Sequence, residues 1–544
     1  MMKGFPFGGR GFYFTACVKD TGMHGREIQA VLRSMAREKP SFLLSELVDR
    51  LGGELEKRDL SRILEPHLDS LGLRGEEKGD DLLISRLPQG RPSILSPDAK
   101  RADEEFLMHP SVPGRLQDLI ESYIARKTGK TWDDPVVLDR IRAAIRAQKG
   151  EYWNQKGARP ISYGAGYRVL AYLAYQAPVA LIQFEHILHE MAAGGLLKDR
   201  MNVLDIGSGP GTVSLAIAET WRRLSPGEVR VSSLERETEN LEAYRSIVPA
   251  FVSGSPSVRV DDPVQGDLRS IDPGILPLGT DLIVFGNVLN ELRDLPVEAR
   301  APLVEGISGT LAGDGTVVIT EPADRENSIA LRKLVAELTG KGMNLYAPCT
   351  HLWSTACRPD RCWTFREGPA ISPTRLMSRL ASSEDGYRYL NTDIKFSYAI
   401  LRTDHRTREG YRIPRGMKAL RLSKLQGHLK RRVNVVVAKM SGDLGGRGNH
   451  VYKVCDGTPQ KPVFAVVPDH HASRGRALMD GHYGEILFLE NILVRSNPAH
   501  DAFNLFVDRF ARIGEIRPGD RDMPSGKRVP FRSGRKIRGG GETS

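Results

Sequence analysis

Three glycines alternate with other residues in one short stretch of the chain. The sequence from Asn202 to Ile217 reads N-V-L-D-I-G-S-G-P-G-T-V-S-L-A-I. Its first residues predict the end of a buried strand, the glycines predict a tight turn, and the residues from Thr212 onward predict a helix. Because glycine has no Cβ, such a turn lets a ligand lie directly against the backbone. The stretch therefore predicts a ligand site between a strand and a helix.

The spacing of this loop separates two classes of ligand. Dinucleotide-binding loops have the longer pattern G-x-G-x-x-G, with a pyrophosphate at the start of the helix. Here the acid Asp205 precedes the glycines in the order D-x-G-x-G-x-G, which resembles the first motif of class I S-adenosylmethionine-dependent methyltransferases. The resemblance implies that the loop holds the methionyl end of this cofactor. A nucleotide loop and a purely structural turn are the alternatives. The loop residues assigned to the cofactor are Asp205, Gly207, Ser208, Gly209, Pro210 and Gly211.

Polar residues follow the next predicted strands at the same edge of the expected sheet. Glu235 ends the apolar run Val229–Leu234, where a carboxylate could accept hydrogen bonds from both ribose hydroxyls. Asp267 follows at the place where this fold turns towards the adenine, and Asn287 comes directly after the fourth strand candidate. Each carboxylate taken alone is more simply a solvated loop residue. Their order along one βαβ series makes Glu235, Asp267 and Asn287 cofactor candidates.

Four cysteines outside this region could bind metal. Cys349, Cys357 and Cys362 fall in one short stretch, and Cys455 lies far downstream. Disulfides are not expected without a secretion signal. The spacing lacks the C-x-x-C pairs of structural zinc sites, whereas the ligands of an iron-sulfur cluster need only converge in space. A four-cysteine zinc site, a three-cysteine zinc site with His351, and unliganded thiols are the alternatives.

The charge of the chain favours a polyanionic partner. Lysine and arginine total 78 against 67 acids, a formal net charge of +11. Cations dominate residues 402–432 and the glycine-rich tail 517–538, so both segments are candidates for phosphate contact, with a disordered solubilising end as the alternative for the tail. No apolar run reaches about 18 residues, which argues against a membrane span. We expect a cytoplasmic protein, with a mitochondrial transit segment as the alternative.

Helical patterns before the glycine loop and short strands after the cysteines predict the remaining architecture. Helices at 28–38, 43–51 and 60–71 followed by a hairpin at 74–87 suggest a winged-helix module, although any small helical domain has similar patterns. We expect a linker at 89–103, then helices at 116–124, 137–146 and 167–192, whose aromatic residues are expected to pack rather than to stack on bases. Short apolar runs after residue 398 suggest a small β-barrel, which could be of the oligonucleotide-binding type.

Together these patterns predict an α/β protein with a class I methyltransferase (Rossmann-like) core. The expected divisions are a helical module, for which a winged helix is one candidate, with a linker at 1–105, a helical cap at 106–200, the methyltransferase core at 201–340, an iron-sulfur-binding segment at 341–400, a basic β-rich domain at 401–515 and a basic tail at 516–544.

Three motifs in this order resemble one family. The core D-I-G-S-G-P-G, the cysteine stretch A-P-C-T-H…C…C-W and the later D-I-K-F-S-Y resemble the methyltransferase-like assembly factors of the small ribosomal subunit, the mitochondrial Rsm22-like proteins with bacterial and archaeal relatives. The resemblance runs from about Lys149, in K-G-E-Y-W-N, to Gly457. It departs at Cys349-Thr350-His351, where the family often has C-P-H. It implies binding to small-subunit ribosomal RNA and a 4Fe-4S cluster. The cluster ligands that it implies are Cys349, Cys357, Cys362 and Cys455.

Two functions from different classes are compatible with these residues. The protein could be an active RNA methyltransferase in which Asn287 or Glu291 orients the base. It could instead be an RNA-binding assembly factor whose cofactor and cluster stabilise the fold, and this is the function we favour. A zinc-containing methyltransferase acting on RNA or protein is a weaker third hypothesis. No catalytic residue is predicted, because the loop Gly286-Asn287-Val288-Leu289 lacks the Asn/Asp-Pro-Pro-aromatic motif of amino-methylating enzymes and no cysteine lies there for cytosine-C5 chemistry.

Overall fold

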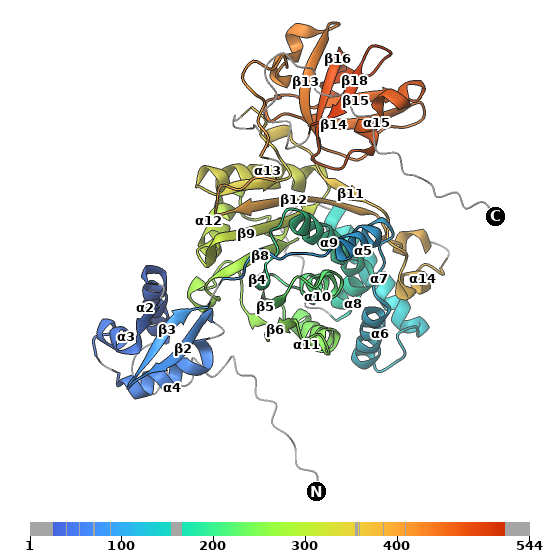
Figure 1. Ribbon diagram of the computed structural model, residues 1–544. Helices are drawn as coiled ribbons and strands as arrows, with labels where there is room; N and C mark the ends of the chain where they lie inside the picture. The colour runs from blue at the N-terminus through green and yellow to red at the C-terminus, as the bar shows by residue number, and fades with distance from the viewer. Residues whose placement is uncertain are drawn as a thin grey trace, which may run out of the picture. The chain divides into compact units, whose positions relative to one another are not determined.

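The chain forms two compact units. The structure, a computed structural model, describes residues 25–153 and 166–516 except 40, 54, 69–70, 88, 354–356, 358, 384–385 and 409. Unit 1 consists of the residues up to Thr320 and of Gly368–Ile394, and unit 2 consists of Glu321–Glu367 and the residues from Lys395 onward. Figure 1 shows the elements of both units. Within the described ranges, no helix has the length and apolar character needed to cross a membrane.

Unit 1 begins with a small α/β module. Its elements are α2 (Gly25–Glu38), β1 (Ser41–Leu43), α3 (Leu44–Arg50), α4 (Lys57–Leu68), β2 (Leu73–Lys78) and β3 (Asp81–Arg86). The strands form an antiparallel sheet in the order β1-β3-β2. Leucines from all three helices and Ile84 from β3 form its buried core. The predicted three helices and hairpin are therefore confirmed.

Among the residues that the structure describes, five helices follow in unit 1 before the central sheet. They are α5 (Pro97–Met108), α6 (Gly114–Thr128), α7 (Pro135–Trp153), α8 (Tyr167–Tyr175) and α9 (Ala177–Ala193). The predicted linker is wrong in its second half, because α5 begins there: the Ser96 hydroxyl accepts the Ala99 N–H at 3.1 Å and Pro97 occupies the first helical position. The single helix predicted at 167–192 is two helices, since a new helix begins at Ala177 with Pro178 in its first turn. Asn154, Tyr163 and the side chains of Tyr152 and Trp153 lie outside the described residues.

A parallel sheet forms the centre of unit 1. Its strands are β4 (Arg200–Ile206), β5 (Glu228–Glu235), β6 (Val258–Val260), β8 (Thr280–Gly286) and β9 (Leu311–Pro322), in the order β6-β5-β4-β8-β9, and the short β7 (Val264–Gln265) also pairs with β5. The connecting helices are α10 (Thr212–Leu224), α11 (Thr238–Val252) and α12 (Val297–Ser308). The strand order reverses between β4 and β8, and ligands bind at such a switch point, beyond the carboxyl ends of the strands.

The second segment of unit 1 returns to the helices that precede the sheet. It contains α14 (Arg375–Leu380) and a 3₁₀ turn at Gly386–Tyr389. The Arg375 guanidinium bonds to the Glu121 carboxylate of α6 at 2.9 Å, and Arg142 of α7 donates to the Leu380 carbonyl at 3.0 Å. These contacts attach a segment that follows 47 intervening residues to the helical layer.

Unit 2 combines a cysteine-bearing segment with a closed barrel. Before the barrel come α13 (Arg325–Gly340), β10 (Asn344–Ala347) and β12 (Ile394–Arg402), and β10 pairs with β12 in antiparallel fashion. The barrel elements are β13 (Arg432–Lys439), β14 (Asn449–Cys455), β15 (Val463–Pro468), α15 (Ala472–Asp480), β16 (Ile486–Asn497), β17 (Ala502–Phe506) and β18 (Arg512–Glu515). The strand order is β13-β14-β15-β17-β16-β18, and pairing of β13 with β16 closes a five-stranded barrel. This confirms the predicted small barrel.

Candidate functional site

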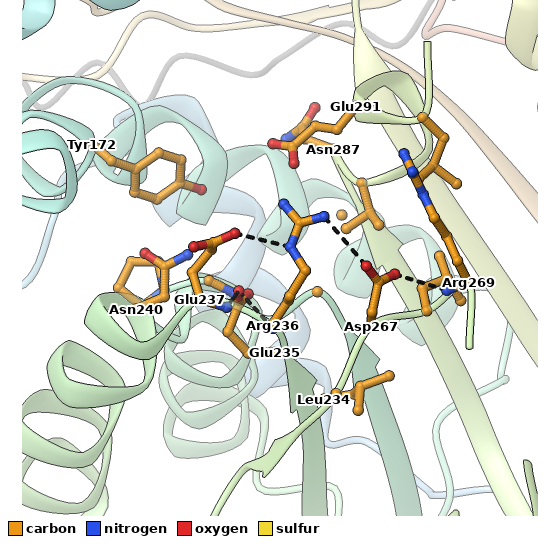
Figure 2. Close-up of a pocket in the computed structure, with 18 residues that line it drawn as sticks. Tyr172, Leu234, Glu235, Arg236, Glu237, Asn240, Asp267, Arg269, Asn287 and Glu291 are labelled. Atoms are coloured by element: carbon orange, nitrogen blue, oxygen red, sulfur yellow. Dashed lines mark hydrogen bonds and ion pairs between the residues drawn. The ribbon is translucent and has the colours of Figure 1, made fainter. Parts of the chain in front are cut away.

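A cleft lies at the carboxyl ends of β4, β5 and β8 in unit 1, where the strand order reverses. Figure 2 shows the side chains that surround it. Of the predicted cofactor residues, six line this cleft: Gly207, Gly209, Pro210, Glu235, Asp267 and Asn287. The residues come from the loop after β4, the end of β5, the segment after β7 and the loop after β8. Four stretches that are distant in the sequence therefore meet at one cleft, as the βαβ order predicts.

The glycine loop has the backbone conformation that only glycine adopts readily. Gly207, Gly209 and Gly211 have φ values of +66°, +56° and +94°. A Cβ at Gly207 would lie 2.5 Å from Val288 Cγ2, and one at Gly211 would lie 2.2 Å from Val248 Cγ2. A Cβ at Gly209 would meet no atom within 4 Å among the described residues. Gly207 and Gly211 therefore serve close packing, whereas Gly209 leaves open space on the cleft side.

Glu235 places a buried carboxylate at the wall of the cleft. The carboxylate accepts three backbone N–H groups, from Gly209 at 2.7 Å, Arg236 at 2.8 Å and Glu237 at 2.7 Å. These bonds fix the side chain and tie the end of β5 to the glycine loop. A carboxylate offers about four lone-pair sites, so one acceptor site remains for a hydroxyl of a bound ligand.

Asp205 lies behind the glycine loop and outside the cleft lining. Its side chain is buried, and neither carboxylate oxygen has a hydrogen-bond partner among the described residues. Burial, with a smaller contribution from the charge of Glu235, raises the pKa of Asp205 to about 8. Ser208 and Gly211 are likewise absent from the lining. The motif thus supplies two kinds of residue, those that face the cleft and those that support the loop from behind.

Two further predicted residues, Asp267 and Asn287, also line the cleft. The Asp267 carboxylate accepts the Arg269 backbone N–H at 2.9 Å and lies 3.5 Å from Arg236 Nη1. Asn287 has a φ of +56°, a conformation uncommon for non-glycine residues, and its backbone N–H donates to the Thr320 carbonyl at 2.9 Å. Such conformations gather at functional sites, because the surrounding structure must enforce them.

Six polar or aromatic residues of the cleft were not among the predicted cofactor residues. They are Tyr172, Arg236, Glu237, Asn240, Arg269 and Glu291, all of which Figure 2 labels. Tyr172 belongs to α8, and burial raises its pKa to about 12, so its hydroxyl stays protonated and can donate a hydrogen bond. No local motif marks Tyr172 or Asn240. The helical spacing of Tyr172 predicted packing, and only the fold shows that both residues reach the cleft.

The cleft suits S-adenosylmethionine in three respects. Gly209 leaves room against the backbone, Glu235 offers an acceptor, and Asp267 places a second carboxylate in the lining. The arrangement also matches the position of cofactors at switch points of open α/β sheets. The residues present therefore fit the predicted cofactor.

The four cysteines all belong to unit 2. Cys349 follows β10, Cys357 and Cys362 lie in the next segment, and Cys455 ends strand β14 of the barrel. Burial raises the pKa of Cys349 and of Cys455 and raises that of Cys357 to about 12, and the charges of neighbouring cysteines add to each shift. Without a metal, the raised pKa values favour the protonated thiols of Cys349, Cys357 and Cys455. Protonated buried thiols are poor nucleophiles, which argues against a catalytic cysteine here.

Arg332 of α13 is buried beside these cysteines. Its Nη2 donates to the Tyr398 carbonyl at 2.6 Å and to the Ser397 hydroxyl at 3.1 Å. Its Nε and Nη1 have no hydrogen-bond partner in the described part of the chain. Burial lowers the pKa of this guanidinium, but the neighbouring Cys349 leads the charges that raise it above its ordinary value. A buried guanidinium with two unused nitrogens requires a nearby anion, which deprotonated cysteines would supply.

The cysteine side chains do not converge on one point. Within the described ranges, no group of three or more His, Cys, Asp or Glu side chains has the geometry of ligands to a single metal ion.

Much of the predicted cationic segment at 402–432 is used inside unit 2. Arg402 pairs with Asp404 at 2.6 Å, Arg412 donates to the Thr350 carbonyl at 2.9 Å, and Arg432 forms an ion pair with Asp508. These arginines hold the segment in place. The tail at 517–538 lies outside the described residues.

The strand order, the glycine loop and the acid at the end of β5 together define a class I S-adenosylmethionine-dependent methyltransferase-like fold. The chain belongs to the Rsm22 family, described as mitochondrial small ribosomal subunit Rsm22, which matches residues 166–442, just over half of its length. Residues 423–516 match the C-terminal domain of a second family, a domain of unknown function (DUF8157). No curated protein matches the chain.

Several solved structures share the methyltransferase description. A methyltransferase structure from Methanococcus maripaludis is 22% identical, with 30% of this chain and 64% of that chain covered and a TM-score of 0.19. One from Methanosarcina mazei is 12% identical, with 40% and 97% covered and a TM-score of 0.25. An arsenic(III) methyltransferase from Chlamydomonas reinhardtii is 15% identical, with 52% and 84% covered and a TM-score of 0.23. The chain thus spans less than two thirds of the first of these, and with such low TM-scores the fold class rests on strand order and loop geometry.

Proposed function

We propose that this protein binds S-adenosylmethionine and small-subunit ribosomal RNA, carries a 4Fe-4S cluster, and assists assembly of the small ribosomal subunit. The family to which the chain belongs is described as a small ribosomal subunit protein. The main observation in favour of the cofactor is that the free space beside Gly209 and the Glu235 carboxylate lie in the same cleft. The winged-helix-like module, the barrel and the net charge of +11 support a nucleic-acid partner.

Each cleft residue has a role towards the cofactor. The backbone of Gly207–Gly211 holds the methionyl end, Glu235 accepts a ribose hydroxyl, and Asp267 contacts the adenine. Ser208 and Pro210 shape the turn, and Asp205 supports it from behind. The cofactor supplies an electrophilic methyl group when bound, and transfer needs little beyond alignment of the acceptor.

The residues on the acceptor side do not favour catalysis. Asn287 and Glu291 line the cleft at the end of β8, where they could orient a base, but the loop lacks the Asn/Asp-Pro-Pro-aromatic motif. We therefore favour an assembly factor in which the cofactor stabilises the fold. An active ribosomal RNA methyltransferase is the second candidate, supported by the position of Asn287 and its left-handed backbone.

The metal site consists of Cys349, Cys357, Cys362 and Cys455, with Arg332 as the adjacent cation. Four thiolates around a four-iron cluster carry net negative charge, and the two unused nitrogens of Arg332 fit that charge. A zinc site with the same cysteines is the alternative.

Anaerobic purification with iron, sulfide and zinc counts tests the metal site. We expect a brown protein with iron and sulfide near four each, and near-complete loss of both in Cys349→Ser, because the cluster needs all its thiolates. Cys17→Ser is the matched control, since Cys17 is not among the proposed ligands, and it should keep full iron. If the wild-type protein is colourless and contains stoichiometric zinc, the cluster is contradicted and the zinc site is favoured.

Calorimetry and crosslinking test the remaining parts. S-adenosylmethionine should bind the wild type, and Glu235→Gln should bind both it and S-adenosylhomocysteine at least about tenfold more weakly, because both share the ribose. Crosslinking in cells should recover small-subunit ribosomal RNA with the full chain. Methyl incorporation into that RNA would favour the second candidate, an active ribosomal RNA methyltransferase. Absence of RNA crosslinks would contradict the proposal.

A further inference from the structure

The barrel of unit 2 carries a groove that neither the cofactor nor the cysteines occupy. Its floor is the outer face of β14 and β15, where Lys453 lies opposite Phe464 and Val451 lies opposite Val466. The alternate residues, such as Tyr452 and Ala465, belong to the buried barrel core. Since side chains alternate between the two faces of a strand, Lys453 and Phe464 lie on the outer face of the barrel, where the Lys453 side chain is buried and donates to the Trp363 carbonyl.

Three segments form the walls of this groove. The β13–β14 loop contributes Ser441 and Leu444, the β16–β17 connection contributes Asn497–Asp501, and the segment after Cys362 contributes Trp363. The groove is therefore bounded by both ends of the barrel strands that form its floor.

Trp363 offers a large aromatic surface to solvent. Its side chain is 44% exposed, although exposed tryptophans are uncommon. The indole Nε1 donates to the Ala323 carbonyl at 2.8 Å, its own carbonyl accepts from the Lys453 ammonium, and its ring centroid lies 5.7 Å from that of Phe365. A ring that is both held and exposed can stack on a flat ligand with little loss of conformational entropy.

The charge of the groove suits a polyanion. Arg325, Arg361 and Lys453 line it, and the one carboxylate among its described lining residues, Asp501, is paired with Arg361 and with Lys461. The row Lys453–Phe464–Asn504 continues across β14, β15 and β17 to Arg495 of β16. Alternating cations, aromatic rings and amides match the phosphates, faces and edges of nucleotides.

We propose that this groove binds a single-stranded RNA segment, with Trp363 stacking on a base. The closing pair β13–β16, the parallel pair β15–β17 and a helix between the third and fourth strands describe an oligonucleotide-binding barrel. That fold binds oligonucleotides on its second and third strands and on the loops after its first and fourth strands. Here these are β14, β15 and the two loops that line the groove. The inference rests on the proposed function and adds the site and the strandedness of the RNA.

Binding of labelled RNA to the full chain tests this proposal. The probes are an unstructured 12-nucleotide RNA and the same sequence in a duplex, followed by fluorescence anisotropy. Trp363→Ala should weaken single-strand binding about tenfold, because stacking of a base is lost, whereas Trp363→Phe should keep most of the affinity. Phe510→Ala is the matched control, since Phe510 is a 50% exposed aromatic of the same barrel outside the groove, and it should bind like the wild type.

A second variant guards against an indirect effect through the neighbouring Cys362. His500→Ala changes the exposed side chain of the β16–β17 connection and should weaken single-strand binding several-fold, with an unchanged melting temperature and metal content. Wild-type affinity in both Trp363→Ala and His500→Ala would overturn the proposal that the groove binds RNA. Equal binding of duplex and single strand would overturn it as well. Unchanged RNA affinity combined with lost capture of ribosomal proteins would assign the groove to a protein partner instead. In each of these cases ribosomal RNA crosslinking by the wild type would leave the proposed function standing, and its absence would remove that function.

Discussion

At the scale of single residues, ionisation of the buried Asp205 carboxylate is unfavourable, because no hydrogen bond from the described residues compensates for the loss of water. Both its oxygens are buried without a hydrogen-bond partner among the described residues, and burial raises its pKa to about 8. An unpaired buried carboxylate favours its protonated form, because ionisation in a low-dielectric site is unfavourable. The stability of the cofactor-free protein should therefore depend on pH through this residue.

The Asp205→Asn variant should be more stable than the wild type near neutral pH. The unfolded chain releases the Asp205 proton near pH 4, whereas the folded protein keeps it up to about pH 8. The wild type therefore loses free energy of unfolding as the pH rises between these values, and the variant avoids this loss. Urea denaturation without cofactor should give a gain of about 1–3 kcal/mol at pH 8 and little difference at pH 4.

The conservative control is Asp294→Asn, because Asp294 is an exposed acid whose Arg269 partner lies on the surface. It should change the free energy of unfolding by less than about 1 kcal/mol at both pH values. A difference between wild type and Asp205→Asn that does not grow with pH would contradict the assignment of a buried, protonated carboxylate.

At the scale of elements, the glycine loop should separate binding from stability. Gly209→Ala and Gly211→Ala each force a left-handed conformation on an L-residue, at about 1–2 kcal/mol. Of the two added methyl groups, only the one at position 211 clashes, with Val248 Cγ2. Gly211→Ala should therefore lower the free energy of unfolding by a further amount of about 1–3 kcal/mol. Gly209→Ala should instead fill cofactor space and weaken S-adenosylmethionine binding at least about tenfold.

Calorimetry and urea denaturation on the two variants check this pair. Equal loss of stability in both would show that the space beside Gly209 is closed. Unchanged cofactor affinity in Gly209→Ala would place the cofactor elsewhere.

The elements that depend on local sequence could be predicted, and those that depend on tertiary contacts could not. The strand, glycine loop and helix around Asp205 are consecutive in the sequence from Arg200 to Leu224, so their chemistry is visible in one stretch. Helix α5 was missed because proline and charge resemble a linker, although Asp103 is buried and binds His189 and Arg223. Periodicity indicated packing for Tyr172, yet the fold brings it to the cleft.

The same limit applies more strongly to the cysteine site. Cys349, Cys357 and Cys362 lie within one short stretch, so the sequence alone marks them as candidate ligands. Arg332 could not be assigned, because it belongs to an ordinary amphipathic helix and only burial against the cysteines reveals its role. The barrel was predicted from the spacing of short apolar runs, whereas the groove requires the register of Lys453 against Phe464 and the position of Trp363.

At the scale of the whole molecule, the two units should respond to different ligands. The cofactor cleft lies in unit 1 and the cysteines lie in unit 2. S-adenosylmethionine at a hundred times its dissociation constant should stabilise unit 1 by about 2.7 kcal/mol. Cys349→Ser should lower the melting transition of unit 2 and leave the cofactor-dependent transition unchanged.

Differential scanning calorimetry under anaerobic conditions measures both effects. We expect two transitions, of which the cofactor raises one and the cysteine variant lowers the other. A single transition that moves with both perturbations would contradict separate assignment of the two ligands.

The interleaving of the two units along the chain also constrains biosynthesis. Unit 1 ends with Gly368–Ile394, and a ribosome must first translate Glu321–Glu367, which carries three of the four cysteines. A nascent chain released anywhere in this interval lacks α14 and the Arg375–Glu121 pair, and it also lacks every strand of the barrel. A premature stop codon between residues 321 and 394 should therefore yield no intact unit, and expression of unit 1 alone should require a short bridge in place of residues 321–367.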